Sequence, residues 1–145
     1  MNTSFTKTQW VAAGVALVMA GALLIGGTSR AQGEEIGVEV KPVSAEKLAN
    51  VAGKSLTDVV VNYAPGGKSG KHHHAGSVFA YVLSGAIRSE NSATGPVKVY
   101  KAGESFFEPP GSEHLVSENA SATEPASLLA VFVADDRAQL TTFDK

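Results

Sequence analysis

The sequence contains no cysteine, which excludes a disulfide framework, thiolate metal ligands and a cysteine nucleophile. Any metal ion that the protein binds must therefore be held by histidine, carboxylate or water. The chain also lacks an excess of charge of either sign, because its formal net charge is -2 over 145 residues. Such a chain offers no basic field to a phosphate backbone, so we expect no nucleic-acid partner.

The longest hydrophobic run lies near the N-terminus. A lysine precedes a segment from Trp10 to Ile25 that is apolar or small throughout, and small residues follow as far as Ala31. This order predicts a secretory signal peptide, residues 1–31, and hence a periplasmic or secreted protein. The alternative is an uncleaved membrane anchor, because Trp10 to Gly27 is just long enough to cross a bilayer. Membrane association is expected only in that case.

Helical periodicity is almost absent from the rest of the chain. Seven short segments instead have the length and the β-branched and aromatic content of strands. These segments are Leu56–Tyr63, Ser77–Leu83, Ala86–Glu90, Val97–Tyr100, Glu104–Glu108, His114–Glu118 and Ser127–Ala134. Glycine and proline residues that favour turns lie between them. Many short strands at this spacing predict an all-β sandwich or barrel.

The chain has room for one domain. About 114 residues remain after removal of the signal peptide, which is enough for a single hydrophobic core. We expect an N-terminal extension over residues 32–54, a β-barrel over residues 55–135 and a C-terminal tail over residues 136–145. Within the extension, Ser44 to Asn50 is expected to form a short helical turn.

Three consecutive histidines are the most distinctive feature of the sequence. In an extended chain, His72 and His74 point to one face and His73 to the other, because side chains alternate. His114 follows forty residues after His74, just beyond a Pro-Gly turn. A His-x-His pair with one distant histidine is typical of a metal centre that keeps positions open for water or substrate. A histidine triplet taken alone is more simply explained as a polar surface loop.

The segments around these histidines resemble the two motifs of the cupin superfamily. The first is GKSGKHHHAGSVFAYVLSG, Gly67 to Gly85, and the second is GESFFEPPGSEHLVSEN, Gly103 to Asn119. The resemblance covers about Leu56 to Ala134 and implies a small single-domain cupin, which is a jelly-roll β-barrel. In such a barrel both motifs line one end and the histidines point inward. The turn at Pro109 to Gly111 then aims the last histidine at the site.

Carried over to this sequence, the resemblance implies that His72, His74 and His114 bind one divalent transition metal. Fe(II) is favoured, while Zn, Mn, Cu and Ni also suit imidazole ligands. The implied function is that of an exported metal-binding cupin, an oxidoreductase of dioxygenase type that acts on a small polar or anionic substrate. The alternative is a non-enzymatic cupin that binds or senses a small ligand or a metal. A homodimer is a further expectation.

One position departs from the family pattern. Many cupins carry a glutamate four residues after the second histidine of the pair, and here that position is Val78. Three neutral imidazoles would leave a divalent ion its full charge of +2, which favours anionic or chelating ligands. Three-histidine centres occur in cupin-like oxygenases, so the resemblance does not require the glutamate for catalysis.

Three glutamates flank the second motif and offer a carboxylate in principle. By alternation from His114, Glu118 would face inward, and Glu108 would lie at the rim. Carboxylates are rarely buried without a partner. We therefore expect Glu108, Glu113 and Glu118 to be solvated, and we assign none of them as a ligand.

The aromatic residues in the strands are expected to lie mostly in the barrel core. They are Phe79, Tyr81, Phe106, Phe107 and Phe132. Phe106 and Phe107 are adjacent and must face opposite ways in a regular strand. One of the two is therefore expected outside the barrel or at an oligomer interface.

Overall fold

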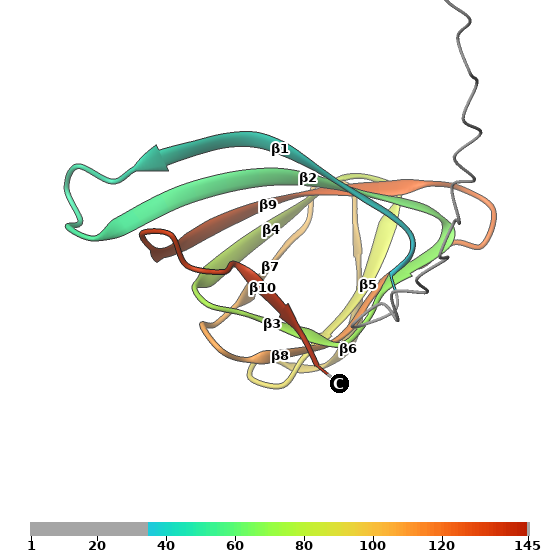
Figure 1. The fold of residues 1–145 in the computed structure, drawn as a ribbon. Coiled ribbons are helices and arrows are strands. Elements are labelled where there is room, and N and C mark those ends of the chain that lie inside the picture. Colours follow the sequence, from blue (N-terminus) through green and yellow to red (C-terminus); the bar gives the residue numbers. More distant parts are fainter. Residues whose placement is uncertain (1–34, 145) are drawn as a thin grey trace, which may run out of the picture.

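The computed structural model describes residues 35–144, which form an all-β, nearly closed antiparallel barrel (Figure 1). The barrel architecture agrees with the jelly roll that the resemblance implies. The predicted signal peptide, residues 1–31, lies outside the described residues. In the described part of the chain, no helix is long and apolar enough to cross a membrane.

Ten strands make up the described part of the chain. They are β1 (Ile36–Lys47), β2 (Lys54–Ser69), β3 (His72–His74), β4 (Ser77–Ser84), β5 (Ala86–Asn91), β6 (Gly95–Lys101), β7 (Ser105–Glu108), β8 (Glu113–Asn119), β9 (Ala126–Asp135) and β10 (Thr141–Phe143). The seven predicted strands are confirmed as β2 and β4 to β9. The helical turn expected from Ser44 to Asn50 is wrong, because residues up to Lys47 continue β1 and pair with β2.

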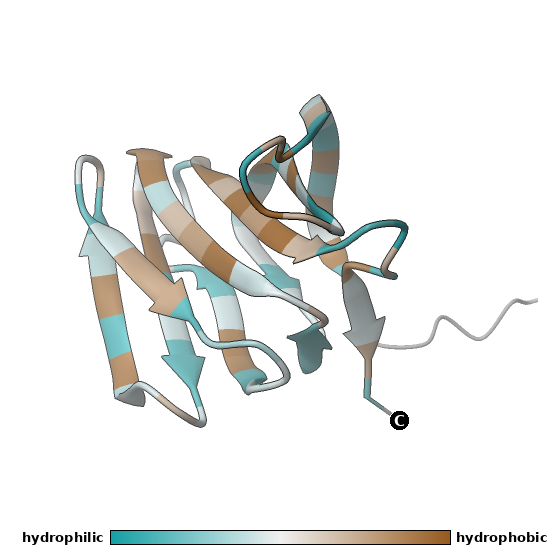
Figure 2. Cartoon of the chain, turned by 90° about the vertical axis from the view of Figure 1, so that its left-hand side faces the viewer, coloured by the Kyte–Doolittle hydropathy of each residue, from teal (hydrophilic) through white to brown (hydrophobic). Residues whose placement is uncertain are grey.

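The strands form two facing layers (Figure 1). One layer has the order β1, β2, β9, β4, β7, and the other has the order β10, β3, β8, β5, β6. The long β2 joins them, because residues 54–63 pair with β9 whereas Lys68 and Ser69 pair with β8. Bands of hydrophobic and hydrophilic residues alternate along the strands (Figure 2), as expected when one face of each strand is buried.

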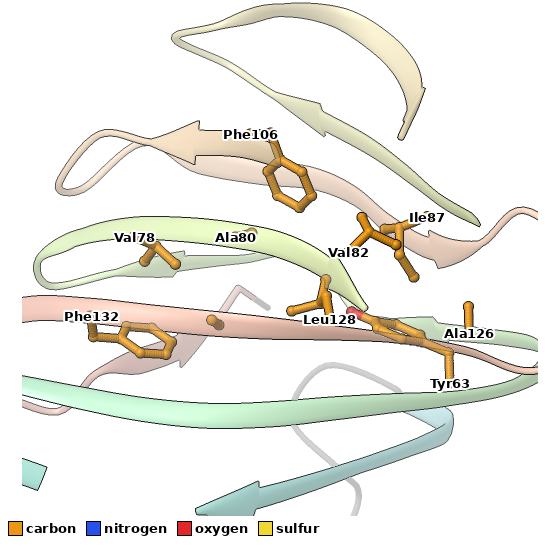
Figure 3. Close-up of a cluster of buried hydrophobic side chains, with 10 residues drawn as sticks. Tyr63, Val78, Ala80, Val82, Ile87, Phe106, Ala126, Leu128 and Phe132 are labelled. Carbon is orange, nitrogen blue, oxygen red and sulfur yellow. The ribbon is translucent and has the colours of Figure 1, made fainter. Parts of the chain in front are cut away.

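The hydrophobic core lies between the two layers. Its buried members are Tyr63, Val78, Ala80, Val82, Ile87, Phe106, Ala126, Leu128, Ala130 and Phe132. Val78 and Phe132 lie at one end of this cluster, and Val82 and Ile87 lie at the other (Figure 3). Full burial of an aliphatic side chain stabilises the fold by about 1.5–3 kcal/mol.

The aromatic residues divide between the core and the outer face. Phe106 and Phe132 are buried, whereas Phe79, Tyr81 and Phe107 are 38–48% exposed. The expectation that the aromatics lie mostly in the core is wrong for Phe79 and Tyr81, because they alternate with the inward-facing residues of β4, whereas the exposure of Phe107 is the expected outcome for one of the two adjacent phenylalanines. The opposite orientation of Phe106 and Phe107 is confirmed.

Candidate metal centre

The three predicted ligands meet between the layers. His72 and His74 lie on β3, and His114 lies on the neighbouring β8, where it is the direct antiparallel partner of His72. All three residues are buried. Ligand atoms of the three rings all lie within 4.8 Å of one another, a grouping that could hold one metal ion after small side-chain adjustments. The structure therefore brings together all three residues that the sequence singled out.

His73 points away from this cluster, as alternation along the strand predicts. Its side chain is partly exposed, and its Nδ1 atom lies 3.2 Å from Asp144 Oδ1 on the outer surface. The histidine triplet thus contributes two residues to the site and one to the exterior.

A tight turn before β8 sets the position of His114. Gly111 adopts a φ of 71°, a left-handed conformation that glycine tolerates best. Its N–H donates a 2.8 Å hydrogen bond to the His74 carbonyl oxygen. The turn that precedes His114 is therefore tied directly to the strand that carries the other two histidines.

Backbone carbonyls hold the two histidines of β3 in one tautomer. His72 Nδ1 lies 2.7 Å from the Gly70 carbonyl oxygen, and His74 Nδ1 lies 3.1 Å from the Leu140 carbonyl oxygen. A carbonyl oxygen can only accept, so Nδ1 carries the proton in both rings. The Nε2 lone pairs of His72 and His74 are consequently left for a metal ion.

His114 has the opposite arrangement. Its Nε2 lies 2.9 Å from Ser89 Oγ, whereas its Nδ1 is buried and has no hydrogen-bond partner in the described part of the chain. Glu108 Oε2 lies 2.9 Å from Nδ1, but this contact lacks the direction of a hydrogen bond, so we assign the proton to Nε2, where Ser89 Oγ can accept it. The orphaned Nδ1 lone pair is then explained by a metal ion, so the donor set fits one.

Glu108 also lies at the centre, contrary to the expectation that it is solvated at the rim. It ends β7 and is only 3% exposed. Its Oε2 atom lies 2.9 Å from His114 Nδ1 and 3.8 Å from His74 Nε2. The buried carboxylate therefore belongs to the same polar cluster as the imidazoles. Glu108 faces the same side of β7 as Phe106, but the sequence alone does not tell which of Phe106 and Phe107 points inward.

The other two flanking glutamates remain outside the centre. Glu113 is exposed and lies 3.0 Å from Lys71 Nζ, as a solvated residue should. Glu118 pairs with Arg88 instead of facing inward. Alternation fails for Glu118 because β8 carries an irregularity after His114, which shifts the inward positions to Ser117 and Asn119.

Burial and neighbouring groups set the protonation states of the cluster. Burial lowers the pKa of His72 to about 4, although the Gly70 carbonyl opposes this effect. Burial likewise lowers the pKa of His74. For Glu108, burial acts to raise the pKa, but the adjacent His114, followed by His74 and His72, holds it below its ordinary value. Neutral imidazoles and an ionised carboxylate are the forms that bind metals.

A cavity of about 90 Å³ adjoins the cluster. The wall includes apolar side chains, and Phe132 and Phe106 are among the aromatic ones (Figure 3). Tyr63 and Ser117 also line the cavity. Their hydroxyl oxygens lie 2.8 Å apart and share a hydrogen bond. Burial raises the pKa of Tyr63, which keeps its hydroxyl protonated. Typical ligand pockets are about 300–1,000 Å³, so this cavity admits only a small molecule.

Comparisons with known proteins agree with this architecture. The profile of the Cupin domain family matches residues 59–132. A cupin-2 domain protein from Rhodospirillum rubrum has a TM-score of 0.58 at 18% sequence identity, with 77% of this chain and 68% of that chain covered. No curated protein matches the sequence.

Two similar structures belong to enzymes with different reactions. An oxalate oxidase in complex with the substrate analogue glycolate has a TM-score of 0.57 at 24% identity, with 74% of this chain and 55% of that chain covered. A DMSP lyase has a TM-score of 0.53 at 20% identity, with 62% of this chain and 44% of that chain covered. The chain thus spans about half the length of these two enzymes, and the likeness concerns the fold.

Proposed function

Because the chain belongs to the Cupin domain family, we propose that it is a mononuclear metal enzyme, an oxidoreductase of dioxygenase type for a small polar or anionic substrate. The observation that carries the proposal is the convergence of three buried imidazole lone pairs beside a cavity. Fe(II) is the metal we expect first, with Zn, Mn, Cu and Ni as alternatives. We also propose that the signal peptide exports the protein to the periplasm or the exterior.

Different residues of the site have different proposed roles. His72, His74 and His114 would hold the ion, and their partners Gly70, Leu140 and Ser89 keep each ring in the required tautomer. A redox-active divalent ion would supply a place where substrate and dioxygen bind side by side and exchange electrons. The apolar side chains of the wall lower the polarity around that place.

The cavity points to a substrate with few heavy atoms. A volume of about 90 Å³ suits a short organic acid better than a sugar or a polymer. The hydroxyl of Tyr63 can donate a hydrogen bond to an oxygen of such an acid. The glycolate bound by the structurally similar oxalate oxidase is a molecule of this size and supports the choice of short hydroxy acids as first candidates.

Elemental analysis and oxygen uptake test the proposal. Protein purified from its native compartment should contain about one transition-metal ion per chain. After loading with Fe(II), it should consume dioxygen with at least one acid from a panel of short carboxylic acids. A His72→Ala/His114→Ala variant should bind little metal and consume no dioxygen. Absence of stoichiometric metal from the native protein would contradict the metal centre.

Oxygen uptake also separates the proposed enzyme from other cupins. A binding or sensing module would retain the metal and bind an acid without consuming dioxygen. Metal-dependent lyase or isomerase chemistry would form product under anaerobic conditions. Either result would overturn the oxidoreductase assignment while leaving the metal centre intact. N-terminal sequencing of the mature protein tests export separately, since cleavage after Ala31 exposes Gln32.

A further inference from the structure

We propose that Glu108 is a fourth metal ligand, which supplies from β7 the carboxylate that Val78 does not provide from β4. The inference rests on the proposed metal centre of His72, His74 and His114. It assigns a ligand that the family resemblance does not predict, because this glutamate lies in the segment before the second-motif prolines.

The contact between Glu108 and His114 has the distance of a hydrogen bond but not the direction of one, which we interpret as two ligands that face a shared ion. Glu108 Oε2 lies 2.9 Å from His114 Nδ1, yet that nitrogen has no hydrogen-bond partner in the described residues. With the His114 proton on Nε2, a carboxylate oxygen faces an imidazole lone pair. These two atoms repel each other unless a cation lies between them.

Coordination distances agree with this interpretation. Metal–ligand bonds of about 2.1 Å at right angles place neighbouring ligand atoms about 3 Å apart, and ligands on opposite sides about 4.2 Å apart. The 2.9 Å distance from Glu108 Oε2 to His114 Nδ1 matches neighbouring ligands. The 3.8 Å distance from the same oxygen to His74 Nε2 lies between the two values. Both distances are thus compatible with an ion that Glu108 shares with His114 and His74.

A neighbouring amide holds the carboxylate in this place. Asn91 Oδ1 accepts a hydrogen bond from the Ala93 backbone N–H at 3.0 Å, which turns the amide nitrogen of Asn91 towards Glu108. Asn91 Nδ2 then lies 3.4 Å from Glu108 Oε2. The long, neutral contact orients Glu108 without neutralising it. A buried carboxylate still needs a cation, and a metal ion provides one.

Strand register explains how the carboxylate reaches the centre. Val78 and Glu108 are direct antiparallel partners in β4 and β7, and both are buried. Directly opposed residues point to the same face, with Cβ atoms about 5 Å apart. The carboxylate is thus supplied by the strand next to β4. The glutamate side chain is long enough to reach His114 and His74 from there.

The charge of the centre changes as a result. An ionised Glu108 reduces the total charge of a bound divalent ion from +2 to +1. The sequence alone implied a charge of +2 for the centre, because Val78 stands where many cupins have a glutamate. With Glu108 as a ligand, the charge of the centre is +1 instead. A singly charged acid would neutralise the centre, whereas a doubly charged acid would leave a net negative charge in an apolar cavity. We therefore infer a monoanionic substrate.

Co(II) binding to the metal-free protein tests the ligand assignment without any activity assay. Glu108→Gln removes the charge but keeps the shape, and it should raise the dissociation constant of Co(II) by about 100-fold or more and alter the visible Co(II) absorption bands. The matched control is Glu113→Gln, which changes an exposed glutamate paired with Lys71. The control should leave both the affinity and the spectrum unchanged.

A double substitution tests the relocation directly. Val78→Glu/Glu108→Val moves the carboxylate back to β4, and it should bind Co(II) within about 10-fold of the parent. If Glu108→Gln fails to fold, Glu108→Asp replaces it, since it keeps the charge but retracts the carboxylate by one methylene. Glu108→Asp should also weaken binding and shift the spectrum.

The outcomes separate the two proposals. Unchanged Co(II) affinity in the folded Glu108 variants would overturn the ligand assignment. Weaker binding with an unchanged spectrum would also overturn it, because it would give Glu108 only a positioning role. If His72→Ala retains full Co(II) binding, the three-histidine centre itself fails. A dicarboxylate that binds the loaded protein more tightly than its monocarboxylate analogue would overturn the inference about substrate charge.

Discussion

The interior of the barrel has two ends with opposite chemistry and similar burial. At one end, Val82 and Ile87 have no exposed surface. At the other end, His72, His114 and Glu108 are nearly as buried but polar. Burial of apolar surface stabilises the fold, whereas burial of polar groups costs free energy unless they are paired. The polar end should therefore cost the metal-free protein stability, and in the proposed function a bound metal ion offsets that cost.

Both ends are built by the same strands with the same alternation. On β4, Val78 lines the same cavity as the histidines. Val82 lies beside Ile87 in the apolar core (Figure 3). The scaffold that forms the core therefore also aims the side chains of the centre. If the two ends have separate roles, substitutions at the polar end should change metal binding, and substitutions at the apolar end should change stability.

Removal of two ligands should have the largest effect. In His72→Ala/His114→Ala, the metal content should fall from about one ion per chain to near zero, because a single histidine and one carboxylate do not hold a divalent ion firmly. Elemental analysis after dialysis measures this content. The metal-free variant should remain folded, since it buries less polar surface. Full metal content in the double variant would show that the ion binds elsewhere.

A cavity at the apolar end should affect stability alone. Ile87→Ala should lower the free energy of unfolding by about 2–5 kcal/mol, because it removes buried methyl groups and leaves a void. Urea titration of the metal-free protein measures the loss. The folded variant should still bind one ion per chain. Val99→Ala, at an exposed position of β6, is the matched control and should change stability by less than about 0.5 kcal/mol. If folded Ile87→Ala loses its metal ion, the apolar end also affects metal binding, and the two ends do not have separate roles.

The sequence was sufficient for the part of the molecule that depends on local pattern. Alternating β-branched residues and turn-forming glycines predicted seven strands, and the period of two placed His72 and His74 on one face. His114 was predicted as the third ligand from the spacing of the two cupin-like motifs. The strands, the histidine pair and the third ligand could therefore all be read from short segments and from the distances between them.

The sequence was insufficient where strand pairing decides the outcome. Glu108 faces inward because Phe106 does, and which of the adjacent phenylalanines points inward depends on the pairing of β7 with β4. Glu118 faces outward because of an irregularity in β8. β10 is too short to be recognised locally and forms by pairing with the histidine strand. Non-local contacts set all three results.

Acid should weaken the metal-free protein through its polar end. Burial lowers the pKa of His72 to about 4, so the folded protein keeps this ring neutral while the unfolded chain takes up a proton near pH 6.5. His72 therefore leaves the free energy of unfolding unchanged above pH 6.5. As the pH falls from 6.5 towards 4, it lowers the free energy of unfolding by up to about 3 kcal/mol. His74 should add to the loss, since its pKa is also lowered by burial.

Urea titrations of the metal-free protein between pH 7.5 and pH 4.5 measure this dependence. In His72→Ala the slope of stability against pH should be shallower, because the group that titrates is gone. Ile87→Ala should shift the whole curve downward and keep its slope. Equal slopes in the parent and in His72→Ala would show that the buried ring does not carry the acid sensitivity.

The smallest effect is expected for the residue that orients His114. Ser89→Ala removes the hydroxyl that lies 2.9 Å from His114 Nε2, so the ring can place its proton on either nitrogen. The Co(II) dissociation constant should rise by about 10- to 100-fold, and the visible spectrum should stay that of the parent because the ligand set is unchanged. Ser89→Thr keeps the hydroxyl and should restore affinity. An unaffected Ser89→Ala would mean that the metal selects the tautomer by itself, and that the polar end depends on its ligands alone.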